Sequence, residues 1–137
     1  MRLTTAMLAD AAQVQGGKLF VLGGGFDTIS ARSFPVVHRS LSVALVAEIQ
    51  PDERHRDLEI EIVLMDEDGA EIGVQAKGKL RVGAPPNLPP GSTSIVPIVS
   101  PFYNVKFPEA KGYVFHVGYE GDELARVASQ KDQAKYP

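Results

Sequence analysis

The sequence predicts an all-β fold, an antiparallel β-sandwich of about eight strands, with at most a short helical turn near the N-terminus. Apolar residues recur at every second position in most segments, which is the period of a strand with one buried face. Turn-forming residues separate these segments at short intervals. The length of 137 residues suits one domain with one hydrophobic core. We therefore expect two packed sheets, with a barrel as the alternative.

The N-terminal part carries three candidate strands and one ambiguous segment. The strands are expected over residues 3–8, 18–22 and 26–29. Residues 6–14 are rich in alanine, which favours helix, but the two glycines that follow limit any helix to a couple of turns. A strand from Leu3 to Leu8 that enters this segment is the alternative.

The central part predicts a strand over residues 40–50 and then a β-hairpin. The hairpin joins residues 58–64 to residues 72–82 through the three-residue loop Glu67-Asp68-Gly69, where glycine adopts positive φ without steric cost. This loop places the apolar faces of both strands on the same side of the hairpin. It also brings acidic residues opposite the basic residues of the second strand, Lys77, Lys79 and Arg81. The predicted pairs are Leu64 with Ile72, Ile62 with Val74, Ile60 with Ala76, Glu59 with Lys77 and Asp57 with Lys79.

The segment after this hairpin predicts a stiff connector and an edge strand. Residues 85–91 are rich in proline and should form an extended link between two strands. Pro97 removes a ladder donor from the candidate strand at residues 94–99, so this strand should be bulged or lie at a sheet edge. Residues 129–137 have little to bury, so we expect a single domain over residues 1–128 and a flexible polar tail after it.

A second hairpin is expected near the C-terminus, between residues 113–119 and residues 124–128. Its register stays open. A two-residue loop, Gly121-Asp122, pairs Tyr119 with Leu124, whereas a three-residue loop pairs Phe115 with Val127.

Composition narrows the classes of function. The formal net charge is −3 and the pI is near 5.6, so we expect no nucleic acid as partner. No stretch approaches the ~18 consecutive apolar residues of a membrane span. The apolar run before Asp10 is too short for a signal peptide, and we therefore expect a cytoplasmic protein. Without cysteine, neither a disulfide nor a thiolate metal site can form.

Three motif-like patterns have simpler structural explanations. Residues 73–79 match the start of a phosphate-binding loop, but Leu80 stands where a Ser or Thr should hold Mg²⁺, and the alternation indicates a strand. Asp66, Asp68 and Glu71 resemble part of a calcium loop, but a hairpin turn accounts for them. The three histidines, His38, His55 and His116, lack metal-site spacing, with His116 expected to face solvent. We expect no catalytic residues, metal or cofactor, and we lean against an enzyme.

The glycine-rich segment Gly23-Gly24-Gly25-Phe26-Asp27 is the candidate contact site for a ligand or partner. Its backbone amides could approach an anion, as those of other glycine-rich loops do, although Thr28 stands where a dinucleotide fingerprint needs its third glycine. A bulge or sharp bend between two strands is the structural explanation.

Several short segments are distinctive in combination. They are Ala9-Asp10-Ala11-Ala12, Gly17-Lys18-Leu19, Leu22 to Asp27, Phe34-Pro35, His55, Asp66 to Gly69, Phe107-Pro108 and Tyr113 to Phe115. In these segments the chain resembles a family of short, uncharacterised bacterial proteins, a domain of unknown function. The resemblance implies a self-contained bacterial domain and assigns no site residues.

Two functions are consistent with this reasoning. The first is a non-catalytic binding or assembly module, with self-association as its simplest form, that uses the edge at residues 94–99 or an apolar patch around Val63 and Met65. A protein partner or a homo-oligomer is then expected. The alternative is a small-molecule binding protein or enzyme with a pocket near residues 23–27.

Overall fold

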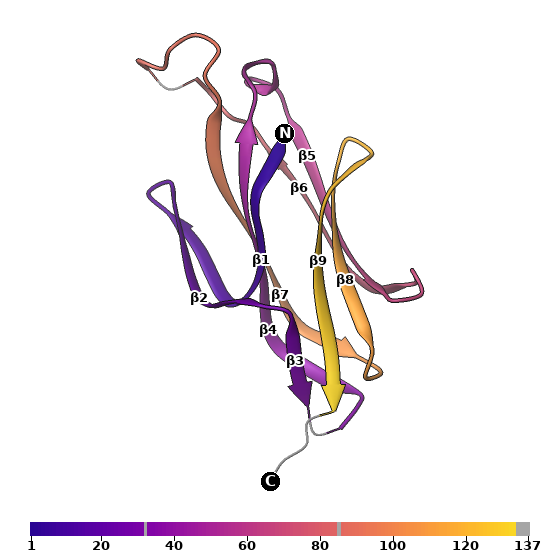
Figure 1. Ribbon diagram of the computed structural model, residues 1–137. Helices are drawn as coiled ribbons and strands as arrows, with labels where there is room; N and C mark the ends of the chain where they lie inside the picture. The colour runs from indigo at the N-terminus through magenta and orange to yellow at the C-terminus, as the bar shows by residue number, and fades with distance from the viewer. Residues whose placement is uncertain (32, 85, 134–137) are drawn as a thin grey trace.

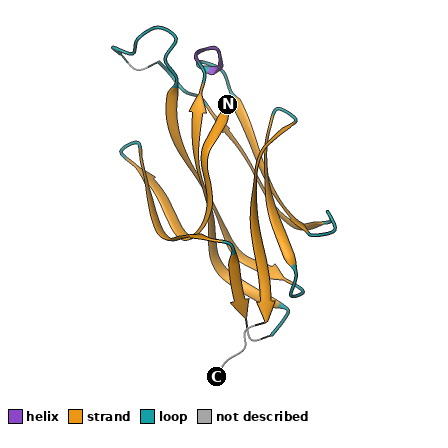
Figure 2. Cartoon of the chain, viewed as in Figure 1, coloured by secondary structure: helices purple, strands orange, loops and turns teal. Residues whose placement is uncertain are grey.

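Two packed β-sheets make up the computed structural model, which describes residues 1–31, 33–84 and 86–133 (Figure 1, Figure 2). Sheet A has four strands in the order β2-β1-β4-β7, and sheet B has five in the order β3-β9-β8-β5-β6. The prediction of an all-β sandwich is confirmed. The strands are β1 (Arg2–Gln15), β2 (Lys18–Phe26), β3 (Thr28–Ala31), β4 (Val36–Ile49), β5 (Leu58–Asp66), β6 (Glu71–Leu80), β7 (Ser94–Phe107), β8 (Gly112–Tyr119) and β9 (Asp122–Gln133).

The core lies between the facing sides of the two sheets, where alternate residues of the central strands are buried. Ring centroids of Phe102 and Phe115 lie 5.4 Å apart, and those of Phe107 and Tyr113 lie 4.9 Å apart. Burying one large apolar side chain contributes about 1.5–3 kcal/mol. This apolar layer therefore holds the sheets together. Its fully buried members include Leu8, Leu41, Val43, Leu45, Leu64, Phe107, Phe115 and Val117.

β1 settles the ambiguous N-terminal segment in favour of a strand. It pairs with β4 and then with β2 along its whole length, so backbone pairing overrides the helix preference of its alanines. Among the described residues the only helical turn is the 3-10 turn Pro51–Glu53, which follows β4. The helical turn expected near the N-terminus is absent from the described residues.

The loop of the β5–β6 hairpin confirms the prediction. The Asp66 N–H donates to the Ala70 carbonyl oxygen at 2.9 Å, which closes a three-residue loop over residues 67–69. Gly69 has a φ of 84°, the conformation for which glycine was expected there.

The predicted register of this hairpin is wrong by two residues beyond a bulge at Gly73, whose φ is 83°. At this point one residue of β5 lies opposite three residues of β6. Two extra residues are thus inserted in β6, and because this number is even, every side chain keeps its predicted face. The observed pairs are Glu59 with Lys79, Ile60 with Gly78, Glu61 with Lys77 and Ile62 with Ala76, in place of the predicted ones. The region that resembles a phosphate loop lies in β6.

In the β8–β9 hairpin the predicted pair of Tyr119 with Leu124 is wrong, and the predicted pair of Phe115 with Val127 is confirmed. Its two-residue loop is Glu120-Gly121, with φ of 49° and 84°, one residue earlier than expected, and Tyr119 pairs with Asp122. An irregularity after Val117 then shifts the ladder to the predicted pair of Phe115 with Val127.

β7 forms an edge of sheet A, as Pro97 predicted. The strand is longer than expected and contains a second proline, Pro101. At the C-terminus, β9 runs to Gln133 and so enters the segment expected to be a tail, while residues 134–137 lie outside the described residues. Among the described residues, no helix has the length and apolar character needed to cross a membrane.

Candidate binding surface

The hairpin of β1 and β2 leaves the body of the sandwich. β1 pairs with β4 only as far as Ala9, which lies opposite Ser42, and from there it pairs with β2 alone. A bulge marks this point, because Leu8 pairs with Phe26 and Ala9 with Gly24. Figure 1 shows the hairpin projecting to the left of the two sheets. We call residues 10–25 the arm.

The arm bends toward the outer face of sheet A. Strands are spaced about 4.8 Å apart, so β2 and β7, with two strands between them, would lie roughly 14 Å apart in a flat sheet. Their Cα atoms instead approach within 8 Å. Val14 accordingly lines one groove together with Val99 and Pro101 of β7. On the same outer face of β4, Ser42 and Ala44 are buried.

Exposed apolar side chains gather on this arm. Large hydrophobic residues that are exposed elsewhere in the described chain are Val37, Ile95 and Tyr103. Single exposed apolar residues are ordinary at a protein surface, whereas a group of neighbours marks a contact site. The members on the arm, with their exposed fractions, are Val14 at 43%, Phe20 at 49%, Val21 at 39% and Leu22 at 73%.

The predicted contact residues lie at the base of the arm. Gly23, Gly24, Gly25 and Phe26 belong to β2, and Asp27 connects β2 to β3. Gly25 has a φ of 83° and occupies the bulge, which confirms the structural explanation of this segment. Whether these residues contact a ligand stays a prediction.

Two of these glycines permit close packing between the strands of the arm. A Cβ atom at Gly23 would overlap the Asp10 carboxylate, and one at Gly24 would overlap the Val21 side chain and lie 3.1 Å from the Met7 sulfur. A substituent would require the Asp10 carboxylate to move at Gly23 and the Val21 side chain to move at Gly24, so the glycines have a packing role independent of any ligand.

A second candidate is an open groove of about 560 Å³ on the outer face of sheet B, where Gly118 provides no side chain. Two pairs of its residues lie in polar contact. Lys79 lies 3.8 Å from Glu59, and His116 Nδ1 lies 3.2 Å from Glu123. A hydrogen bond from Arg126 lowers the pKa of Glu123. These contacts are those of exposed ion pairs, which contribute little each.

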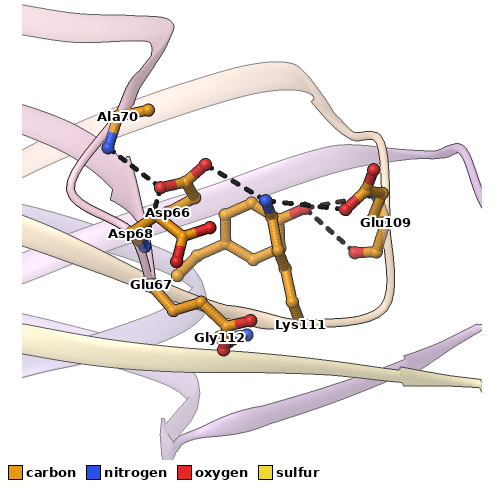
Figure 3. A network of polar contacts seen from close by, with 8 residues as sticks. Asp66, Glu67, Asp68, Ala70, Glu109, Lys111 and Gly112 are labelled. Atoms are coloured by element: carbon orange, nitrogen blue, oxygen red, sulfur yellow. Dashed lines mark hydrogen bonds and ion pairs between the residues drawn. The ribbon is translucent and has the colours of Figure 1, made fainter.

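The acidic residues that resemble a calcium loop form a turn instead (Figure 3). Asp66 Oδ1 accepts the N–H groups of Asp68 and Ala70, both at 2.9 Å, and Asp66 Oδ2 lies 3.1 Å from the Lys111 ammonium group. The hydrogen bond from Ala70, followed by that from Lys111, lowers the pKa of Asp66. This carboxylate thus joins the β5–β6 turn to the segment before β8. Among the described residues, no group of three His, Asp or Glu side chains could hold a metal ion.

A buried polar cluster lies at the other end of the sandwich, around Glu53. Its Oε2 accepts hydrogen bonds from the Met1 amino group and the Tyr119 hydroxyl, both at 2.7 Å, and its Oε1 accepts the Gln50 N–H at 2.9 Å. Arg56 donates to the Tyr119 hydroxyl oxygen at 3.1 Å. Sequence reasoning missed this cluster because its members are far apart in the chain.

The ionisation of this cluster points to a structural role. Burial alone would raise the pKa of Glu53, but hydrogen bonds from the Met1 ammonium group, Gln50 and Tyr119 outweigh it, and the pKa is lowered. Burial and the bond to Glu53 raise the pKa of Tyr119 to about 12. Near pH 7 the carboxylate stays charged and the phenol stays neutral, so neither group is tuned for proton transfer.

A comparison with protein-family models matches residues 4–129 to a family of unknown function, DUF6941. The chain belongs to this family. The match confirms the resemblance to a domain of unknown function, and it covers the whole arm and nearly all of both sheets. A comparison with curated proteins finds no match. The family description names no activity, so the function has to be argued from the surface of the DUF6941 domain itself.

Proposed function

We propose that this domain is a non-catalytic binding or assembly module and that the arm is its contact surface. The observation that carries the proposal is the group of exposed apolar side chains at Val14, Phe20, Val21 and Leu22. Exposed apolar surface costs free energy in water, and burying it against a partner recovers about 25 cal/mol per Å². The arm projects from the sandwich (Figure 1), and its apolar side chains are exposed.

The two contact surfaces expected from sequence are less suited to this role. Val63 is buried, at 9% exposure, so the patch around Val63 and Met65 offers little apolar surface. In β7, Pro97 and Pro101 are four residues apart, and their nitrogens point to the same side of the strand. A proline in a sheet directs its nitrogen away from the existing ladder, here the one with β4. Because a proline nitrogen carries no hydrogen, both prolines would interrupt pairing with an added strand.

The alternative of a small-molecule pocket at residues 23–27 has less support. None of these five residues lines the groove on sheet B. None lines the groove that Val14 forms with Val99 and Pro101 of β7. The packing role of Gly23 and Gly24 also accounts for them without a ligand. We therefore keep protein binding as the proposed function, and we place the protein in the bacterial cytoplasm, which cell fractionation would contradict by finding it elsewhere.

Matched substitutions on and off the arm test this function. Leu22→Lys alters the arm, and Tyr103→Lys alters a residue of nearly equal exposure, 69% against 73%, on β7. C-terminally tagged wild-type protein and both variants are immobilised and offered native lysate and, separately, purified untagged protein. We expect protein retained by wild type and Tyr103→Lys to be lost with Leu22→Lys. Equal retention by all three, or no retention by any, would contradict the proposal.

A further inference from the structure

We propose that the partner of the arm is a second copy of this chain, bound by antiparallel pairing of the two β2 edge strands across a two-fold axis. This inference rests on the proposed function of the arm and adds the identity and orientation of the partner. The pairing would join two copies of sheet A into one continuous sheet.

In residues 19–22 the β2 edge lacks the devices that prevent strand addition, and the bulge at Gly25 lies beyond this segment. Among the described residues β2 pairs only with β1, so its second edge forms no ladder with another strand. Its residues 19–26 include neither proline nor a charged residue. Natural edge strands are usually blocked by lysine, proline, bulges or short length, because an unblocked edge pairs with other chains. An apolar edge left unblocked is therefore suited to a partner that supplies another strand.

The other three edges carry such devices. β7 has Pro97 and Pro101, β6 has Lys77, Lys79 and the bulge at Gly73, and β3 is only four residues long. Residues 19–22 of β2 carry no such device, and this contrast within one molecule indicates that their unpaired edge serves a contact. A second β2 strand is a chemically matched occupant, because it offers the same apolar side chains and the same unpaired backbone edge.

Charge at the ends of β2 favours the antiparallel orientation. Lys18 begins the strand, and Asp27 directly follows it. Parallel pairing would place Lys18 beside its own copy and Asp27 beside its own copy. Antiparallel pairing brings the basic end of one strand to the acidic end of the other, and like charges are separated. A two-fold axis produces this orientation, and closed two-fold dimers are the commonest homo-oligomers.

The side chains near the middle of the strand would meet across the axis. Phe20 and Leu22 lie on the same side of β2, and both are strongly exposed in the single chain. Each would pack against apolar residues of the second copy, so one substitution removes two contacts. Leu22→Lys is therefore expected to weaken self-association at least about 100-fold, since burying one leucine is worth about tenfold or more.

Sedimentation equilibrium tests the identity of the partner. The proposal predicts a concentration-dependent dimer of the 14.8 kDa chain for wild type and Tyr103→Lys, and a monomer for Leu22→Lys under the same conditions. Circular dichroism shows whether the variant is folded. A folded wild-type protein that stays monomeric at about 100 μM would overturn the inference. If the arm of this monomeric protein still retained another protein from lysate, the proposed binding function would stand, and only the identity of the partner would be wrong.

Single cysteines test the orientation, because the chain has none of its own. Under mild oxidation, Leu22→Cys is expected to form a disulfide-linked dimer, since residue 22 lies near the centre of the paired strands. Lys18→Cys should not cross-link with itself, whereas a mixture of Lys18→Cys and Phe26→Cys should. Efficient self-linking of Lys18→Cys would show parallel pairing, and linking only through Tyr103→Cys would show that β7 is the contact. Either result would overturn the inference.

Discussion

Replacing Glu53 by glutamine tests how the buried polar cluster stabilises the sandwich. The substitution keeps the size of the side chain but places an amide where the carboxylate accepts hydrogen bonds from the Met1 ammonium group, Gln50 and Tyr119. The ammonium group would lose its ion pair with Glu53, whose side chain is only 6% exposed. Breaking a buried ion pair typically costs 3–5 kcal/mol, so we expect a loss of about 3 kcal/mol of unfolding free energy.

Urea denaturation at pH 7 measures this loss, with the tag at the C-terminus so that the Met1 amino group is free. Tyr119→Phe removes the hydrogen bond to the carboxylate and the one accepted from Arg56, keeps the ion pair of Glu53 with Met1, and should cost about 1.5 kcal/mol. Glu48→Gln is the control, because Glu48 pairs with Arg2, whose side chain is 70% exposed, and should cost less than about 1 kcal/mol. Equal midpoints for Glu53→Gln and Glu48→Gln at unchanged m-value would refute the reasoning.

The lowered pKa of Glu53 also fixes the direction of the pH dependence. In the unfolded chain the group titrates near its ordinary value of 4.5, and in the folded protein it titrates lower. Its contribution is therefore complete above pH 4.5 and is lost as the pH falls through the folded-state pKa. The difference in stability between wild type and Glu53→Gln should accordingly shrink in acid, and a constant difference would contradict this assignment.

Three further outcomes follow from the structure. Gly24→Ala should destabilise the domain by about 1–3 kcal/mol through overpacking in the arm, whereas Gly83→Ala, where a Cβ meets nothing within 4 Å, should have little effect in the same urea titration. Phe115→Ala should cost about 3–5 kcal/mol, and a loss under 1 kcal/mol would contradict its place in the core. Absorbance titration should show one tyrosine with a pKa of about 12 that disappears in Tyr119→Phe. Because this folded-state pKa is raised, stability should be constant below pH 10 and fall as the pH rises toward 12.

The strands could be predicted because alternation reports directly on burial. Leu41, Val43 and Leu45 alternate in the sequence and are all buried on the face of β4 that packs against sheet B. The three-residue loop that ends at Gly69 could be predicted equally well. The parity of the two apolar faces and the position of the glycine both indicate this loop length.

The register beyond Gly73 could not be predicted from the same pattern. Inserting two residues preserves the parity on which the prediction relied, so alternation cannot distinguish the two registers. The alanine-rich part of β1 was ambiguous for another reason. Helix propensity is local, and the pairing of β1 with β4 and β2 overrides it.

The arm was missed because sequence does not reveal which apolar residues are exposed. Leu19 to Leu22 form a continuous apolar run, and such a run is ordinarily read as a buried strand. The available signal was the lack of alternation. A strand that is apolar on both faces needs a contact on each face, and in the arm the two sheets leave these faces exposed. The glycines were noted, but their role as the bend that releases the arm depends on pairing with β1.

Amide hydrogen exchange at several protein concentrations tests the central claim most directly, because it reports which edge strand gains protection on association. The account predicts that the amides of residues 19–22 exchange more slowly as the concentration of wild-type protein rises, while those of residues 94–103 on β7 do not change, and that Leu22→Lys abolishes the effect. Protection that rises on β7 and not on β2, or no change on β2 at concentrations where the protein is associated, would contradict it.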